Sequence, residues 1–109
     1  MNKINFLELS KSIDKYWRAY EVLKIDEIAF RLAKIKGEYP FHKHSNEDEF
    51  IYVIKGKVFV DIEDETFDLS EGEGILVPAG KVHRSRTEKD KEAIILLIEP
   101  VRTKTEGEF

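Results

Sequence analysis

The chain has 109 residues, of which 41% are hydrophobic and 37% are charged. This length accommodates one domain around one core, and the composition is that of a folded globular protein rather than a disordered one. Lys and Arg number 18 against 22 Asp and Glu, with both signs interspersed, so no basic surface for nucleic acid is expected. The absence of cysteine excludes disulfide bonds, a thiolate nucleophile and a thiolate zinc site.

The first residues predict a short helix ahead of the main domain. Phe6, Leu9 and Ile13 lie at helical spacing, and Asn5 before them is a suitable N-cap. The N-terminus lacks the apolar core of a signal peptide, and the longest apolar run, IILLI, is far too short to cross a bilayer. We therefore expect a cytoplasmic protein, with no membrane association, whose residues 1–16 form an N-terminal helical segment.

After this segment the hydrophobic pattern repeats every two residues, as in β-strands. Residues 27–37 predict a strand with one face inward, because larger apolar residues alternate with smaller or charged ones: Ile28, Phe30 and Leu32 alternate with Ala29, Arg31 and Ala33. Residues 49–69 are rich in strand formers, with turns at Gly56 and at residues 63–65. Residues 92–100 form a continuous apolar strand.

Four turn-forming residues divide the remaining stretch into short strands: Gly72, Gly74, Pro78 and Gly80. Roughly seven or eight short strands at about ten-residue spacing, with no later helix, predict an all-β sandwich or closed barrel. We place this barrel at residues 17–100 of a single domain. Residues 101–109, VRTKTEGEF, are interpreted as a polar C-terminal tail.

The stretch FHKHSNEDEF, residues 41–50, holds most of the ligand-type side chains. His42 and His44 are two residues apart and would share one face of a strand. A bend over SNED can bring the Glu49 carboxylate to the point that both imidazoles face, and a closing barrel can add His83. Three imidazoles and one carboxylate suit a divalent transition metal: Mn, Fe, Co, Ni, Cu or Zn.

These residues resemble the two sequence motifs of the cupin family. The first motif matches His42, His44, Glu49 and Gly56, and the second matches Gly72, Pro78, Gly80 and His83. The resemblance runs from about Trp17 to Pro100 and is to the small single-domain cupins of the cupin 2 type, often labelled mannose-6-phosphate-isomerase-like. It implies a double-stranded β-helix, a jelly-roll-type barrel, with a metal held by His42, His44, Glu49 and His83. Two positions depart from the family pattern: Gly37, one residue nearer to His42, and Thr87, where an asparagine is common.

Several of these residues have simpler interpretations. Each histidine alone would be read as a hydrogen-bonded turn residue, and only the joint spacing favours a metal site. Glu47 and Asp48 compete with Glu49 as the carboxylate ligand, but only Glu49 stands at the motif distance from a glycine, so the other two are interpreted as solvated loop charges. The motif glycines are interpreted as structural, because they permit positive φ angles at turns.

The faces of the strands predict where other side chains lie. Five basic residues could place charge near the barrel mouth: Arg31, Lys34, Lys36, Arg84 and Arg86. Strand alternation puts Arg84 and Arg86 on the face opposite His83, which indicates a solvated surface. Phe50, Tyr52 and Ile54 point away from the interior, opposite Glu49. This apolar outer face needs a second layer, either the N-terminal helix or another subunit, and we expect a homodimer.

Four protein ligands leave one or two metal positions open, as in a reactive site. Three neutral histidines and one Glu leave a dication site near +1, which favours an anionic or enol-type oxygen ligand. We expect a metal-dependent enzyme of small organic substrates, either an oxygenase or a sugar-type isomerase, which the sequence does not separate. Two alternatives are a non-catalytic binding module acting as a sensor, although no output domain is evident, and a purely structural barrel.

Overall fold

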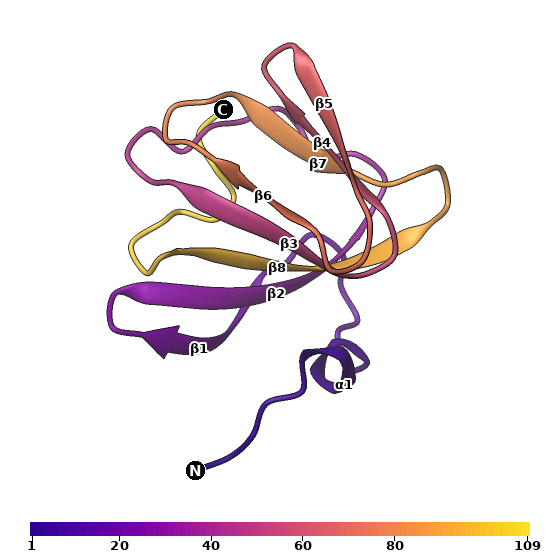
Figure 1. Cartoon of the computed structure of the whole chain (residues 1–109), viewed down its shortest axis with the longest axis vertical. Coiled ribbons are helices and arrows are strands. Elements are labelled where there is room, and N and C mark those ends of the chain that lie inside the picture. Colours follow the sequence, from indigo (N-terminus) through magenta and orange to yellow (C-terminus); the bar gives the residue numbers. More distant parts are fainter.

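Two antiparallel sheets form the body of the protein in a computed structural model that describes residues 1–109 (Figure 1). The larger sheet has the strand order β1-β2-β8-β3-β6 and the smaller sheet the order β5-β4-β7. The predicted all-β class is confirmed. The eight strands are β1 (Tyr20–Ile25), β2 (Ile28–Lys36), β3 (Glu49–Lys55), β4 (Val58–Ile62), β5 (Glu65–Leu69), β6 (Gly74–Val77), β7 (His83–Arg86) and β8 (Glu92–Pro100).

Strand β8 is the centre of the larger sheet and pairs with β2 on one side and β3 on the other. At one level of this pairing, Ile98 lies between Phe30 and Phe50. Both faces of β8 are covered, which explains why its sequence is continuously apolar instead of alternating. The predicted strand over residues 92–100 is confirmed with the same bounds.

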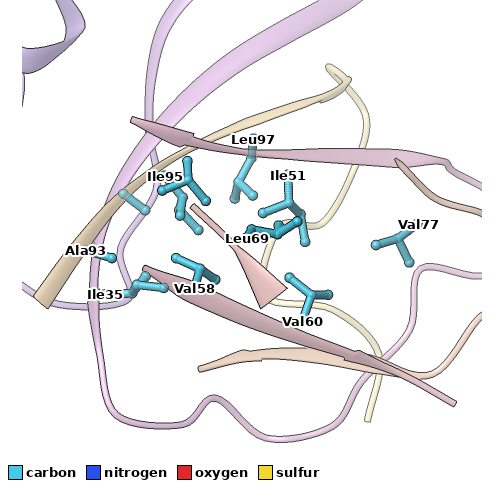
Figure 2. Packing of buried hydrophobic residues seen from close by; sticks show 11 residues of the cluster. Ile35, Ile51, Val58, Val60, Leu69, Val77, Ala93, Ile95 and Leu97 are labelled. Atoms are coloured by element: carbon cyan, nitrogen blue, oxygen red, sulfur yellow. The ribbon is translucent and has the colours of Figure 1, made fainter. Parts of the chain in front are cut away.

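The main hydrophobic core fills the space between the two sheets, where Figure 2 shows the side chains of both sheets meeting. Each contributing strand supplies every second residue, as the period-two pattern requires. Val53, Val58 and Val60 are fully buried, so this part of the interior is closely packed. The cluster consists of Ala33, Ile35, Ile51, Val53, Val58, Val60, Leu69, Val77, Ala93, Ile95 and Leu97.

The inward face of β2 carries the smaller residues, not the larger ones. Ala33 and Ile35 belong to the main core, whereas Leu32 is buried on the outer face of the sheet. The reason is that the outer face has its own apolar cover from the N-terminal segment, in which Ile13 packs against Leu32. The inner face of β2 can therefore bear small side chains next to the site described below.

The outer face of β3 follows the prediction, and the N-terminal segment supplies part of the second layer that it needs. Tyr52 and Ile54 pack in the outer cluster with Ile13. Phe50 lies further along, beside a shallow hollow that Leu76 also lines. Leu76 is 52% exposed, so this part of the outer face is not covered by the chain itself.

The N-terminal helix is present but shorter than the spacing predicts. α1 spans Phe6–Ser10, and the Asn5 side chain caps it by accepting a hydrogen bond from the Glu8 amide at 3.0 Å. The Ser10 and Ser12 hydroxyls bond back to backbone carbonyls, an alternative to continued helical pairing. Leu9 is 42% exposed, and Ile13 reaches the sheet from the irregular segment after the helix. No helix here has the length and apolarity needed to cross a membrane.

One of the motif glycines is required by the turn in which it lies. Gly56 has φ +88, and a Cβ there would lie 2.8 Å from the Glu92 carbonyl oxygen, so this turn requires glycine. The two positions that depart from the family pattern contact each other. The Gly37 amide donates to the Thr87 hydroxyl at 2.8 Å, and the Thr87 amide donates to the Gly37 carbonyl at 2.9 Å.

Candidate metal centre

The three histidines meet at one end of the barrel interior. His83 opens β7, and His42 pairs with it as an isolated antiparallel bridge, with amide-to-carbonyl hydrogen bonds of 3.0 and 2.8 Å. The His42 ring centroid lies 4.4 Å from that of His83 and 5.3 Å from that of His44. All three side chains are buried. The predicted convergence of His42, His44 and His83 is therefore present in the structure.

The nitrogen atoms of these rings are arranged as metal ligands. One ring nitrogen from each histidine lies within 4.8 Å of the other two. His42 Nδ1 donates to the Pro40 carbonyl and His83 Nδ1 to the Lys81 carbonyl, each at 2.9 Å, because a carbonyl can only accept. These backbone bonds orient the rings and leave Nε2 as the ligand atom of each ring that faces the site, as in many metal sites; in His83 this atom is also hydrogen-bonded to Glu49.

The third ring supplies a direct test of whether a metal fits. His44 Nε2 is buried and has no hydrogen-bond partner. An unpartnered polar atom in a protein interior is costly and calls for an explanation. A metal ion bound by the three imidazoles would satisfy this atom, so His42, His44 and His83 could together hold one.

Glu49 lies beside two of the three rings. Its Oε1 is 3.2 Å from His83 Nε2, and its Oε2 is 3.6 Å from His44 Nε2. Burial raises the pKa of Glu49, but the hydrogen bond with His83 and other neighbours outweigh it, so the net pKa is lowered. Burial lowers the pKa of His42. Burial also opposes the charged form of His83, but the hydrogen bonds with Glu49 and the Lys81 carbonyl and the Glu49 charge together outweigh it, so the pKa of His83 is raised. Glu49 is thus an anionic neighbour of the imidazoles.

The two competing carboxylates lie elsewhere and contact no histidine side chain. Glu47 accepts a hydrogen bond from Arg102 Nε at 3.1 Å, and Asp48 accepts one from the Ala79 amide at 2.8 Å. Each carboxylate has a hydrogen-bond partner. Asp48 is also exposed, in line with its interpretation as a solvated loop charge, whereas Glu47 is half-buried. Among the three consecutive acidic residues, Glu49 is the one that faces the site.

A cavity of about 640 Å³ adjoins the histidines and is large enough for a small organic molecule. His42, Glu49 and His83 line it, together with other polar and charged side chains such as Arg31 and Glu106. The tryptophan at its edge is fixed, because Trp17 Nε1 donates to the Lys36 carbonyl at 3.0 Å. The apolar walls come from the larger sheet and the segment before it, namely Trp17, Ala19, Ala33, Ile35, Ile51, Ile95 and Leu97.

A second buried polar group lies next to Glu49, and the sequence analysis did not single it out. Glu99, on β8, is 1% exposed and bonds to the Arg31 guanidinium. Burial first, and then the Glu49 carboxylate, raise the pKa of Glu99 to about 8. The raised pKa of Glu99 and the lowered pKa of Glu49 place the negative charge of this pair mainly on Glu49. Its only signal in the sequence is an acidic residue at the end of an otherwise apolar strand.

Of the five basic residues near the barrel mouth, Arg31 alone faces the interior. Its guanidinium lines the cavity but is engaged by Glu99, Thr105 and two backbone carbonyls. Arg84 and Arg86 lie opposite His83, as predicted, but both bond to Asp61 and are only partly exposed. The Arg86 hydrogen bond, against the opposing effect of burial, lowers the pKa of Asp61 far below its usual range.

Residues 101–109 are not a free polar tail, and this expectation is wrong. The segment leaves β8 and rises toward β7 (Figure 1), and Thr103 within it is buried. The Val101 and Thr103 carbonyls accept hydrogen bonds from Arg31, and Thr105 lines the cavity. The polar composition misled because backbone and hydroxyl groups, not apolar side chains, hold the segment in place.

Comparisons with known proteins agree with this architecture. A protein from Bacillus subtilis (strain 168), YdbB, is 31% identical over 84 residues, which are 76% of this chain and 74% of that one. The crystal structure of a cupin-2 domain containing protein from Shewanella frigidimarina matches with a TM-score of 0.84 at 29% identity, covering 89% of this chain and 93% of that one. Protein NMB1881 from Neisseria meningitidis matches with a TM-score of 0.80, also at 29% identity, covering 91% and 99%.

The family model for the cupin domain, Cupin_2, matches residues 30–99, which include every strand from β3 to β7 and all four predicted ligands. The predicted double-stranded β-helix of the cupin type is therefore confirmed. The strand order, the site at one end of the barrel and the family match lead to one conclusion: the chain belongs to the cupin family, as a small protein of the cupin 2 type.

Proposed function

We propose that this protein binds one divalent transition-metal ion and is a metal-dependent enzyme for a small organic substrate of anionic or enol type. The observation that carries this proposal is His44 Nε2, a buried and unpartnered ligand atom grouped with nitrogens of His42 and His83. A purely structural barrel would gain nothing from this arrangement, because an apolar side chain would avoid the cost of the unpartnered atom.

Glu49 is the fourth ligand in this proposal. Its two oxygens lie 3.2 and 3.6 Å from His83 Nε2 and His44 Nε2, and its lowered pKa keeps it anionic. Nitrogen and oxygen ligands without sulfur suit Mn, Fe, Co, Ni, Cu or Zn. Glu49→Gln should weaken metal binding by more than about 100-fold, the upper end of the loss seen when supporting residues are removed. Glu47→Gln, the matched control in the loop, should leave the dissociation constant unchanged.

The chain's own residues would bind and orient the substrate. The cavity is lined by apolar side chains of the larger sheet and by charged and polar side chains, so an oxygen-bearing group and an apolar body of one substrate would each find contacts there. The Ser85 hydroxyl lines the same cavity and would offer one further polar contact. The metal would supply Lewis acidity or, if it is redox-active, a position for dioxygen, so that oxygenase and isomerase chemistry both stay open.

We also propose that the protein is a cytoplasmic homodimer. The support is the uncovered part of the outer sheet face, where Leu76 is 52% exposed beside Phe50. A second copy could cover these apolar side chains. Light scattering after size-exclusion chromatography should give twice the chain mass, whereas Leu76→Glu should give a monomer. A monomeric wild-type protein at micromolar concentration would contradict the dimer.

The metal proposal is tested by elemental analysis of protein purified without an affinity tag. We expect about one equivalent of a transition metal, either as isolated or after reconstitution. Less than about a tenth of an equivalent in both samples would contradict it. With the loaded protein, oxygen consumption on thiols, diketones and catechols tests the oxygenase class, and sugar-phosphate isomerisation tests the isomerase class. Ligand binding without turnover would instead favour the sensor alternative.

A further inference from the structure

The two histidines of the first motif lie on a short stretch that belongs to no named strand and is held from two sides. On one side, His42 forms its backbone bridge with His83. On the other, Lys43, between the two histidines, bridges to Glu108 near the end of the chain. The Lys43 amide donates to the Glu108 carbonyl at 3.0 Å, and the Glu108 amide donates to the Lys43 carbonyl at 2.8 Å. The C-terminal segment thus acts as the missing neighbour strand of the ligand stretch.

The Glu108 side chain adds a second attachment directly after His44. Its carboxylate accepts a hydrogen bond from the Ser45 amide at 2.8 Å and another from the Ser45 hydroxyl at 2.6 Å. Charge-assisted bonds of this kind are stronger than neutral ones. Glu108 therefore fixes the backbone on both sides of His44.

Gly107 lies against the His42 ring itself. A Cβ at this position would collide with His42 Cδ2 and lie 2.7 Å from Cγ, so only glycine allows the approach. The Phe109 ring centroid lies 5.9 Å from that of His42, and Tyr39 meets the same ring edge-on at 5.0 Å. The Tyr39 hydroxyl in turn donates to the Glu106 carbonyl at 3.0 Å. The ring is therefore enclosed by the C-terminal segment and by a tyrosine bonded to that segment.

We propose that residues 106–109 are positioning residues of the metal site. They hold the His42 ring and the spacing between His42 and His44 before a metal arrives, so that binding does not have to order these side chains. The upstream bonds from Arg31 to Val101 and Thr105 anchor the segment at its other end. This inference rests on the proposed metal-binding function, but its structural half can be tested without metal.

A pair of glycine variants separates positioning from general stability. Gly107 and Gly72 both have left-handed backbones, with φ +91 and +85, so alanine strains the backbone at both. Nothing lies within 4 Å of a Cβ at Gly72, whereas at Gly107 it would collide with His42. Gly107→Ala should weaken metal binding at least about tenfold, while Gly72→Ala, which has the backbone strain without the collision, should bind metal as tightly as wild type. Equal dissociation constants for the two variants would overturn the inference.

Glu108 offers a rescue test. Glu108→Ala removes both acceptors for Ser45 and should weaken metal binding, whereas Glu108→Gln keeps one carbonyl acceptor and should restore a large part of the affinity. Equal affinity of wild type and Glu108→Ala would contradict the role of this carboxylate.

Nuclear magnetic resonance of the metal-free protein tests the inference separately from the proposed function. A wild type that binds no metal would refute the proposed function, but this measurement could still be made. A nuclear Overhauser contact between the Gly107 α-protons and the His42 ring should be present in wild type and lost in Gly107→Ala. Its absence from wild type would overturn the positioning role, whatever the metal content.

Discussion

The inward faces of β2, β8 and β3 change character along their length, and the two layers so formed have different roles. In one layer, Ala33, Ile95 and Val53 pair across the three strands and are almost fully buried. At the end of the same faces, Glu99 and Glu49 replace the apolar side chains and lie equally buried. The strands continue without interruption from one layer into the other, so the same backbone carries both.

The two layers differ in what burial does to them. A buried Val or Ile side chain stabilises the fold by roughly 1.5–3 kcal/mol, whereas a buried carboxyl or imidazole is costly unless it has a partner. The polar layer is partly satisfied from within, through Arg31 and the backbone, but His44 Nε2 is not. The comparison indicates that the apolar layer holds the barrel together, whereas the polar layer is costly to the fold unless a ligand satisfies it.

The largest effect is expected in the apolar layer. Leu69, on β5, is 7% exposed and belongs to the main core. Leu69→Ala should lower the free energy of unfolding by about 2–5 kcal/mol, because it removes buried surface and leaves a cavity. Urea unfolding of metal-free protein measures this loss, and the number of metal ions bound by the folded variant should not change. Leu9→Ala, at a leucine of α1 that is 42% exposed and outside both core clusters, is the control and should cost less, about 1 kcal/mol or below. Similar losses of unfolding free energy in both variants would contradict the claim that the apolar layer holds the barrel together.

The polar layer should stabilise the fold only when its ligand is present. A metal at about 100 times its dissociation constant should raise the free energy of unfolding by roughly 2.7 kcal/mol, because it binds the folded state alone. The increase should disappear in His44→Ala, which lacks the unpartnered ligand atom. Urea unfolding with metal and with a chelator measures both. An equal increase in the variant would place the metal at another site.

A third group of polar residues, on the outer face of the smaller sheet, tests whether paired charges behave differently from the site. Arg86 and Arg84 lower the pKa of Asp61, so its stabilising contribution is complete above the usual aspartate pKa of about 3.9 and is lost as the pH falls toward the folded-state value. Asp61→Asn should cost about 1–3 kcal/mol at pH 7 and less at pH 3. Asp68→Asn, in an exposed ion pair with Lys57, should cost at most about 1 kcal/mol at either pH. A cost for Asp61→Asn that does not change with pH would contradict the assignment.

The sequence was most informative where one pattern had one physical explanation. On β3, the face with Glu49, Ile51 and Val53 was predicted to point inward because Glu49 was expected to meet the histidines. This prediction is correct: Ile51 and Val53 lie in the main core, and Glu49 lies next to His83. The same approach was less informative for β2, where two apolar faces compete: Leu32 is covered by the N-terminal segment, and the inward face is the one with Ala33. Periodicity detects a strand but does not say which of two covered faces is the interior.

The C-terminal segment was missed for a different reason. Its attachments are a backbone bridge at Glu108, hydrogen bonds from the buried Arg31, and the close approach of Gly107 to a ring. None of these changes the hydropathy of the segment, which is polar throughout. A glycine and an aromatic residue close together in VRTKTEGEF were the available signals, and neither is specific without the fold.

The central claim is that the polar layer exists to hold a metal through His42, His44, His83 and Glu49, and His83→Ala tests it most directly. His83 is 1% exposed, and its Nε2 lies 3.2 Å from Glu49. The measurement is metal content per chain of untagged wild type and variant, reconstituted side by side, with circular dichroism as the check on folding. We expect about one equivalent in wild type and almost none in a variant that stays folded. Equal occupancy in the two proteins would contradict the account.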